Sequence, residues 1–99
     1  MDTRRLLWWL LAGSRGGINR ARILLALHDM PSNANQLAEQ LGLDYKTIRY
    51  HLDLLLKHEA IVPQGEGYGT VYFISDDIEG NFNDFREIWD RIGQKRIKQ

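Results

Sequence analysis

The sequence contains no cysteine, only two prolines and no apolar run long enough to cross a membrane. A secreted domain of 99 residues would usually depend on disulfides, so the missing cysteines indicate a cytoplasmic protein and exclude thiolate zinc sites. A composition of 43% hydrophobic and 26% charged residues is typical of a folded protein. We therefore expect one soluble domain spanning residues 1–99, with a single modest core.

An excess of charge of either sign is also missing, because 13 Lys and Arg balance 13 Asp and Glu. The balance hides an asymmetry. Residues 1–58 hold eight basic and five acidic residues, whereas residues 59–99 hold five and eight. The net positive charge of residues 1–58 can attract a polyanion to one face, although a surplus of three charges gives only a weak attraction.

The residue sets that enzymes and metal sites need are absent as well. No nucleophile–base set, glycine-rich dinucleotide motif or P-loop is present, so we expect no enzyme activity and no cofactor. The three histidines stand apart from one another and from clustered carboxylates, so no metal site is expected. Among them, His51 lies at the edge of the core face of its helix, where we expect it to pack and to donate one hydrogen bond, with a phosphate as one possible acceptor. Asp76 and Asp77 are expected to cap the last helix.

The first thirteen residues superficially resemble a signal peptide, with two arginines before the apolar run from Leu6 to Ala12. That run is short, and a tryptophan pair is bulky for such a segment. We expect instead an apolar helix over residues 1–13 that packs on another helix. The glycine-rich stretch GSRGG then breaks the chain.

Three further helices and a hairpin are predicted next. One helix follows Asn19 as a possible N-cap, and another follows Asn33 and ends at Gly42. Asp44 is suited to cap a helix over residues 45–58. Two helices joined by a short turn containing glycine form a helix-turn-helix. The runs AIVPQ and TVYFIS, separated by GEGYG, predict a β-hairpin, and an amphipathic helix over residues 77–93 closes the chain.

This order of elements indicates a winged helix-turn-helix, mainly α with a small β-hairpin (α+β), carrying extra N- and C-terminal helices. The segments NQLAEQLGLDYKTIRYHLDLLLKHEAIV and GYGTVYFIS resemble the ArsR-like winged-helix transcription regulators. The resemblance covers residues 18–75, and the family's TV-x-x-HL pattern reads here as residues 47–52. It implies a DNA-binding transcription regulator without metal-site cysteines.

The helix over residues 45–58 is the predicted recognition helix. Ile48, Leu52 and Leu55 share its inner face, and the N-terminal part of its outer face would enter the major groove. Arg49 can read guanine, Lys46 can contact a base or a phosphate, and the hydroxyl-bearing residues suit the backbone. The expected DNA-binding residues are Tyr45, Lys46, Thr47, Arg49 and Tyr50, with Tyr68 in the wing.

Two acidic residues count against tight DNA binding. Asp53 lies on the DNA side of the predicted recognition helix, where it would repel phosphate. The loop GEGYG brings Glu66 and no basic residue to the wing, whereas wings that enter the minor groove usually carry one. A winged-helix protein–protein interaction module without DNA binding is therefore the alternative reading.

The terminal helices carry more apolar surface than one winged helix needs. A monomer exposing both would show an unusually large apolar patch. We expect a homodimer whose two-fold axis presents two recognition helices to successive major grooves, as the ArsR-like resemblance also implies. The alternative is that the two helices pack on each other within one chain. The expected interface residues are Leu6, Trp8, Trp9, Phe85 and Trp89.

Overall fold

The computed structural model describes the backbone of residues 2–97 and the side chains of residues 2–93. Seven α-helical or 3-10 segments and three short strands follow one another in the described part of the chain. In order they are α1 (Thr3–Leu11), α2 (Gly17–Asp29), β1 (Ser32–Asn33), α3 (Ala34–Leu41), α4 (Tyr45–Lys57), β2 (Ile61–Gln64), η1 (Gly67–Gly69), β3 (Val71–Ile74), α5 (Asp76–Gly80) and α6 (Phe82–Ile97).

The helix starts in the middle of the chain follow from local capping. Asn33 and Gln36 form a complete capping box at the start of α3, and the Asp44 side chain accepts a 2.7 Å hydrogen bond from the Thr47 amide at the start of α4. The prediction for α2 was wrong, because this helix begins at Gly17 with Gly16 as N-cap, two residues before Asn19. Gly16 has φ 82°, a conformation that glycine adopts without steric cost.

The sheet has three antiparallel strands in the order β1-β3-β2, one more than the predicted hairpin. Ser32 pairs with Tyr72 and Asn33 with Val71, so the two residues before α3 extend the hairpin. Alternation of polar and apolar residues cannot reveal a two-residue strand, which explains the omission. Pro63 lies in β2, an edge strand, where its missing N–H is tolerated.

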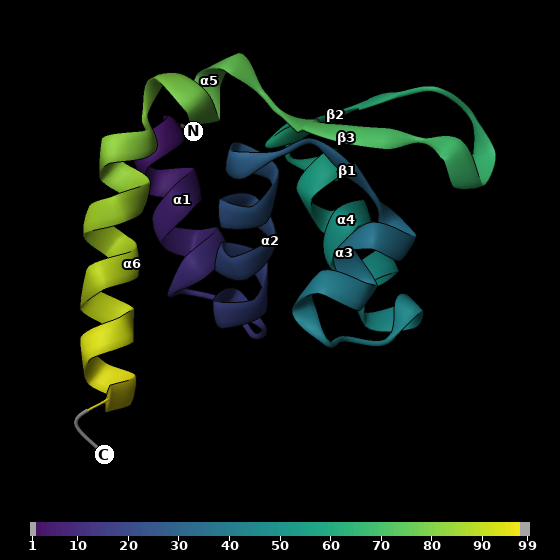
Figure 1. Cartoon of the computed structure of the whole chain (residues 1–99). Coiled ribbons are helices and arrows are strands. Elements are labelled where there is room, and N and C mark those ends of the chain that lie inside the picture. Colours follow the sequence, from purple (N-terminus) through teal and green to yellow (C-terminus); the bar gives the residue numbers. More distant parts are fainter. Residues whose placement is uncertain (1, 98–99) are drawn as a thin grey trace.

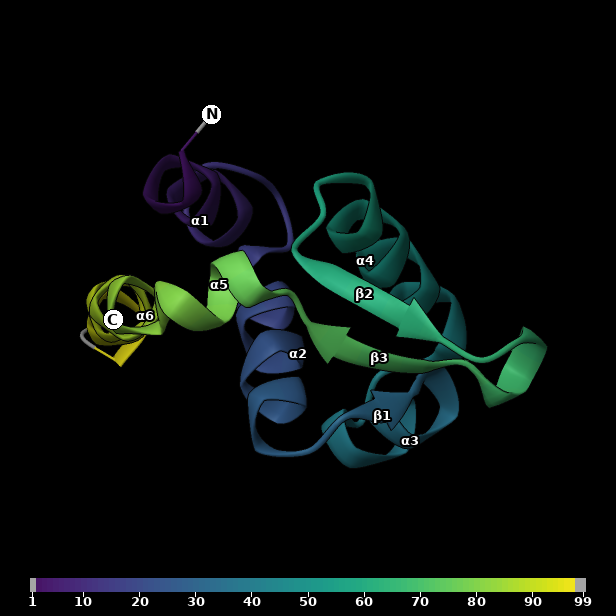
Figure 2. The same ribbon diagram turned by 90° about the horizontal axis from the view of Figure 1, so that it is seen from above.

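The helices are arranged around α2, which lies between two groups (Figure 1). Helices α1 and α6 cover one side of it, and α3 and α4 cover the other. The sheet runs across one end of the helices, and its η1 tip projects on the side away from α6 (Figure 2). Fully buried leucines and isoleucines from α1, α2, α3 and α4 form one continuous core. The fold is therefore a winged helix-turn-helix with added terminal helices.

The predicted C-terminal helix over residues 77–93 is in fact two helices. Ser75 caps the short α5 through a hydrogen bond to the Ile78 amide, and α5 ends at Gly80 with Asn81 as its C-cap. The chain then turns into α6. The amphipathic pattern from Phe82 onward belongs to α6 alone, and glycine with asparagine marks the break between the two helices.

Helices α1 and α6 pack on each other within one chain. Leu7, Leu10 and Leu11 of α1 are buried, as are Phe82, Phe85 and Ile88 of α6. The Arg4 side chain adds ion pairs with Asp84 and Glu87 across the same seam. Helix α1 thus has one buried face and one exposed face, and Trp9 lies on the exposed face.

This packing changes the set of residues available to a second copy. Phe85 has no exposed surface, so its inclusion in a dimer interface was wrong. Trp9 packs against His58 at the end of α4, with ring centroids 5.0 Å apart and ring planes tilted by 56°, whereas Trp8 lies beside Arg91 of α6. The two adjacent tryptophans therefore face different neighbours. Leu6, Trp8 and Trp89 are partly buried against the core.

Candidate nucleic-acid interface

Helix α4 divides into a buried face and an exposed face. Ile48, Leu52 and Leu55 have no exposed surface and anchor the helix in the core. The opposite face is polar from the first turn of α4 onward, and Tyr50 on it is 60% exposed. Its exposed members are Tyr45, Lys46, Tyr50, Asp53 and Lys57, while Thr47 and Arg49 are half-buried.

The tip of the wing lies beside the start of this helix. Tyr68 in η1 is 80% exposed, and its ring centroid is 6.4 Å from that of Tyr45. The first turn of α4 and the wing tip therefore form one continuous surface, with aromatic side chains at the junction. We call Tyr45, Lys46, Tyr50 and Tyr68 the α4–wing surface. Helix α4 and the wing lie on the side of the molecule away from α6 (Figures 1 and 2).

Arg49 is held in place by two intramolecular hydrogen bonds. Its Nη1 donates to the Tyr72 hydroxyl at 2.7 Å, and its Nη2 donates to Asp53 Oδ1 at 2.6 Å. The bond to Tyr72 and the pairing with Asp53 raise the pKa of Arg49 above its usual value. Asp53 is exposed, as expected, and it also forms an ion pair with Arg49. Arg49 would have to use its remaining N–H groups, or release one partner, to bind a base.

A buried arginine that the sequence reasoning missed lies behind the recognition helix. Arg20 of α2 has no exposed surface. Its Nε donates to the Leu10 carbonyl at 2.8 Å, and its Nη2 donates to the Ser14 hydroxyl and the Arg15 carbonyl, both at 2.6 Å. Burial lowers the pKa of Arg20. A signal existed in the sequence, because positions 20, 24 and 27 follow helical spacing and place Arg20 on the inward stripe.

Arg20 also connects α2 to the recognition helix. Its Nη1 is 3.2 Å from His51 Nδ1, and His51 is 4% exposed. Since arginine can only donate, Nδ1 must accept and the ring must be neutral. Gly16 fits closely here, because a Cβ at this position would lie 2.6 Å from His51 Cε1. The expected packing of His51 agrees with this placement, but the ring accepts a hydrogen bond from a guanidinium at Nδ1 instead of donating one.

Acid is expected to destabilise the protein through His51. Burial and the nearby charge of Arg20 lower the pKa of His51 below its ordinary value of 6.5. The unfolded chain then binds the proton more readily than the folded chain, so this stabilising contribution is complete above pH 6.5 and decreases as pH falls below it. Urea unfolding between pH 7.5 and 5 should show the decrease, and His51→Gln should make it shallower.

His58→Gln provides the control for this pH dependence, because His58 packs on Trp9 at the protein surface. The control should keep the pH dependence of the parent. Equal pH dependence in the parent and in His51→Gln would contradict the assignment.

The described residues contain no group of three or more His, Asp or Glu side chains placed to bind a metal ion. Among the helices of residues 2–97, none combines the length and hydropathy that a bilayer span requires. The α4–wing surface is therefore the candidate site that the following comparisons concern.

Comparison with known proteins adds a match for the central segment. Residues 19–64 match a family described as helix-turn-helix domain. A helix-turn-helix domain is thus found in this segment. The matched segment begins in α2, contains α3 and α4 and ends with β2. The match therefore contains α4, the helix predicted to contact DNA, while α1, α5 and α6 lie outside it. No curated protein matches the chain.

The fold of the whole chain has a counterpart among solved structures. The crystal structure of RV1404 from Mycobacterium tuberculosis superposes with a TM-score of 0.68, at 15% sequence identity. The superposition covers 97% of this chain and 67% of that one. At this identity the similarity shows a shared fold, and that fold includes the helices on both sides of the helix-turn-helix domain.

Proposed function

We propose that this protein is a sequence-specific double-stranded DNA-binding transcription regulator of the ArsR-like winged-helix type, without enzyme activity. The observation that carries the proposal is the α4–wing surface. The first turn of a recognition helix lies beside the wing tip there, and both are open to solvent. In helix-turn-helix proteins the N-terminal part of the second helix contacts base edges in the major groove.

Each exposed side chain of this surface has a chemical role in the proposal. Lys46 is a donor for a guanine edge or a phosphate, and the tyrosines donate hydroxyl hydrogen bonds to the backbone or stack on sugars. Arg49 reads a base once its hydrogen bond to Asp53 or Tyr72 is exchanged for one to DNA. Thr47, half-buried beside the N-cap, is placed for a phosphate or a thymine methyl group.

The electrostatics favour binding of moderate strength. Lys46, Arg49 and Lys57 are the basic residues of α4, and Asp53 neutralises one of them. The surplus positive charge of residues 1–58 does not gather here, because Arg20 is buried and Arg4 pairs with α6. Few phosphate contacts imply a shallow dependence of affinity on salt.

A protein–protein interaction module is the second candidate, and one observation favours it. The described wing residues include Glu66 and no basic side chain. Three tyrosines and Val62 are exposed on or near the same side, and aromatic residues are enriched at protein interfaces. In this case the same surface would bind an apolar or aromatic segment of another protein.

Fluorescence anisotropy with a labelled random duplex distinguishes the two candidates. We expect binding at 50 mM salt that weakens at 200 mM, and Lys46→Ala should lower the affinity and reduce the salt slope by about one. Arg5→Ala is the matched control, because it removes one exposed charge from α1. Absence of binding at 50 mM salt, or equal loss in both variants, would favour the interaction module.

We further propose that the protein is a homodimer joined through α1 and α6. Leu6, Trp8 and Trp89 remain candidates for the seam, because the core covers them only partly. A two-fold pair would place two α4 helices on successive turns of one DNA face, since half-sites lie about 34–36 Å apart. Two copies would double the phosphate contacts and offset the weak charge of one α4–wing surface.

Light scattering at micromolar concentration tests the dimer. The expected mass is twice 11.5 kDa, or 23 kDa, and Trp89→Glu should shift it toward the monomer because a charge would be buried in the seam. Circular dichroism must show that the variant remains helical. Asn83→Ala serves as the control on the same helix, because Asn83 is exposed and is not one of the proposed seam residues. A single 11.5 kDa species of the parent protein would end the dimer proposal.

A further inference from the structure

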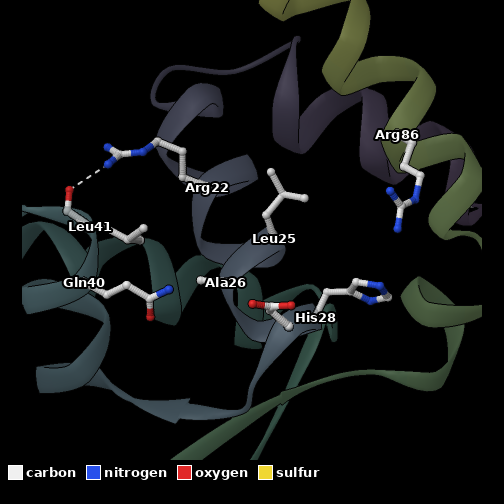
Figure 3. Close-up of a pocket in the computed structure, with 8 residues that line it drawn as sticks. Arg22, Leu25, Ala26, His28, Gln40, Leu41 and Arg86 are labelled. Carbon is white, nitrogen blue, oxygen red and sulfur yellow. Dashed lines mark hydrogen bonds between the residues drawn. The ribbon is translucent and has the colours of Figure 1, made fainter.

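A cavity of about 470 Å³ opens between α2, α3 and α6, away from the α4–wing surface. Helix α2 supplies most of its lining, Gln40 and Leu41 of α3 close one side, and Arg86 of α6 reaches in from the other (Figure 3). Its volume lies within the range of small-molecule sites.

Two arginines flank this cavity without a carboxylate to neutralise them. Arg22 donates from Nη1 to Asn19 Oδ1 at 3.1 Å and from Nη2 to the Leu41 carbonyl at 2.7 Å, so its guanidinium is fixed by neutral partners. Arg86 lies over the Phe82 ring, 5.2 Å from its centroid. Among the side chains of residues 2–93, neither arginine has an acidic oxygen within 4.0 Å.

The remainder of the lining combines apolar and polar groups. Leu25 provides aliphatic surface between the two arginines, and Ala26 and Leu41 add apolar lining (Figure 3). His28 stacks on Phe82 at 3.8 Å and bonds to Glu79, which fixes its ring at the edge. Asp29 is the one acidic residue of the lining and would oppose a ligand of high negative charge.

We propose that this cavity binds a small organic monocarboxylate with an apolar body. The carboxylate would pair with Arg86, because arginine binds carboxylates through charge-assisted hydrogen bonds. The hydrocarbon part would extend from Arg86 across the aliphatic surface of α2 and α3 toward Arg22. The single charge follows from Arg86 as the one partner, since Asp29 would repel a second negative charge. This site is independent of the proposed function, because it shares no residue with the α4–wing surface.

The test is a nuclear magnetic resonance titration of the ¹⁵N-labelled chain with sodium cyclohexanecarboxylate, a probe with one carboxylate on an apolar ring. Saturable shifts are expected for the amides of residues 25–29 and 40–41. The neutral probe cyclohexanecarboxamide, nearly identical in shape, should bind at least tenfold more weakly, because it lacks the charge that Arg86 recognises.

Two variants complete the test. Arg86→Gln should weaken binding of the carboxylate at least tenfold, while Arg91→Gln, which changes an exposed arginine outside the cavity, should leave it unchanged. Both variants change surface residues, and their amide spectra report whether the fold persists. Shifts that do not saturate, equal shifts with the amide probe, or parent-like binding by Arg86→Gln would each overturn the proposal.

Discussion

Replacing Gly17 by alanine is expected to lower the free energy of unfolding by about 3 kcal/mol, in the upper range for overpacked sites. Gly17 is the first residue of α2 and is buried where the chain from α1 enters it. A Cβ at this position would lie 2.0 Å from the Leu11 carbonyl oxygen and 2.5 Å from its carbonyl carbon. Backbone atoms cannot rotate away as a side chain can, so α1 and α2 would have to separate.

Urea unfolding followed by tryptophan fluorescence measures this change. Gly80→Ala is the matched control, because a Cβ there meets no atom within 4 Å and Gly80 is exposed at the end of α5. The control should stay within about 0.5 kcal/mol of the parent. If Gly17→Ala is as stable as Gly80→Ala, the close contact between α1 and α2 is wrong.

Arg49→Ala is expected to weaken binding to the preferred duplex by about 5- to 150-fold, which corresponds to about 1–3 kcal/mol. The reason is that Arg49 is the residue of the recognition helix with a guanidinium able to form paired hydrogen bonds to guanine. Its bonds to Tyr72 and Asp53 restrict the side chain before DNA binds, which reduces the conformational entropy lost on binding.

Tyr72→Phe separates base reading by Arg49 from its anchoring. This variant keeps the ring beneath the guanidinium, 5.9 Å from its centroid, and removes only the hydroxyl acceptor. It should therefore weaken binding less than Arg49→Ala does, while the fold is preserved. Anisotropy on one selected duplex compares the two. Parent-like affinity of Arg49→Ala would show that Arg49 only connects α4 to the wing.

The elements that local chemistry determines could be predicted from the sequence. Asn33 with Gln36 and Asp44 with Thr47 set the starts of α3 and α4, because each cap acts within three residues of its own helix. The buried face of α4 was also predicted, because the spacing of apolar residues along one helix is a local pattern. Strand β1 was not predicted, because two extended residues become a strand only by pairing with β3, which is distant in sequence.

The candidate interface was predictable in its position but less so in its contacts. The exposure of Tyr50 and Tyr68 follows from their places on a helix face and in a glycine-rich loop. The bond between Arg49 and Tyr72 joins residues 23 positions apart and depends on how the wing folds over α4. Arg20 was overlooked because a buried arginine without a carboxylate is rare, and backbone carbonyls serve as its acceptors here.

The dimer interface was predicted from the apolar area of the terminal helices together with the ArsR-like resemblance, and neither reveals which surface covers that area. The stripe of α6 that includes Phe85 is covered by α1 of the same chain. Ion pairs from Arg4 to α6 fix that arrangement further, and charges so far apart in sequence give no local signal. What remains for a second copy is the partly covered surface around Trp8 and Trp89.

Selection of bound sequences from a random duplex pool tests most directly whether α4 reads DNA sequence. We expect an enriched motif, with two related half-sites about 10–10.5 base pairs apart for the dimer. Repeating the selection with Arg49→Ala should relax one base position in each half-site and leave the others enriched. A pool that stays as random as the input after repeated rounds would contradict sequence-specific DNA binding.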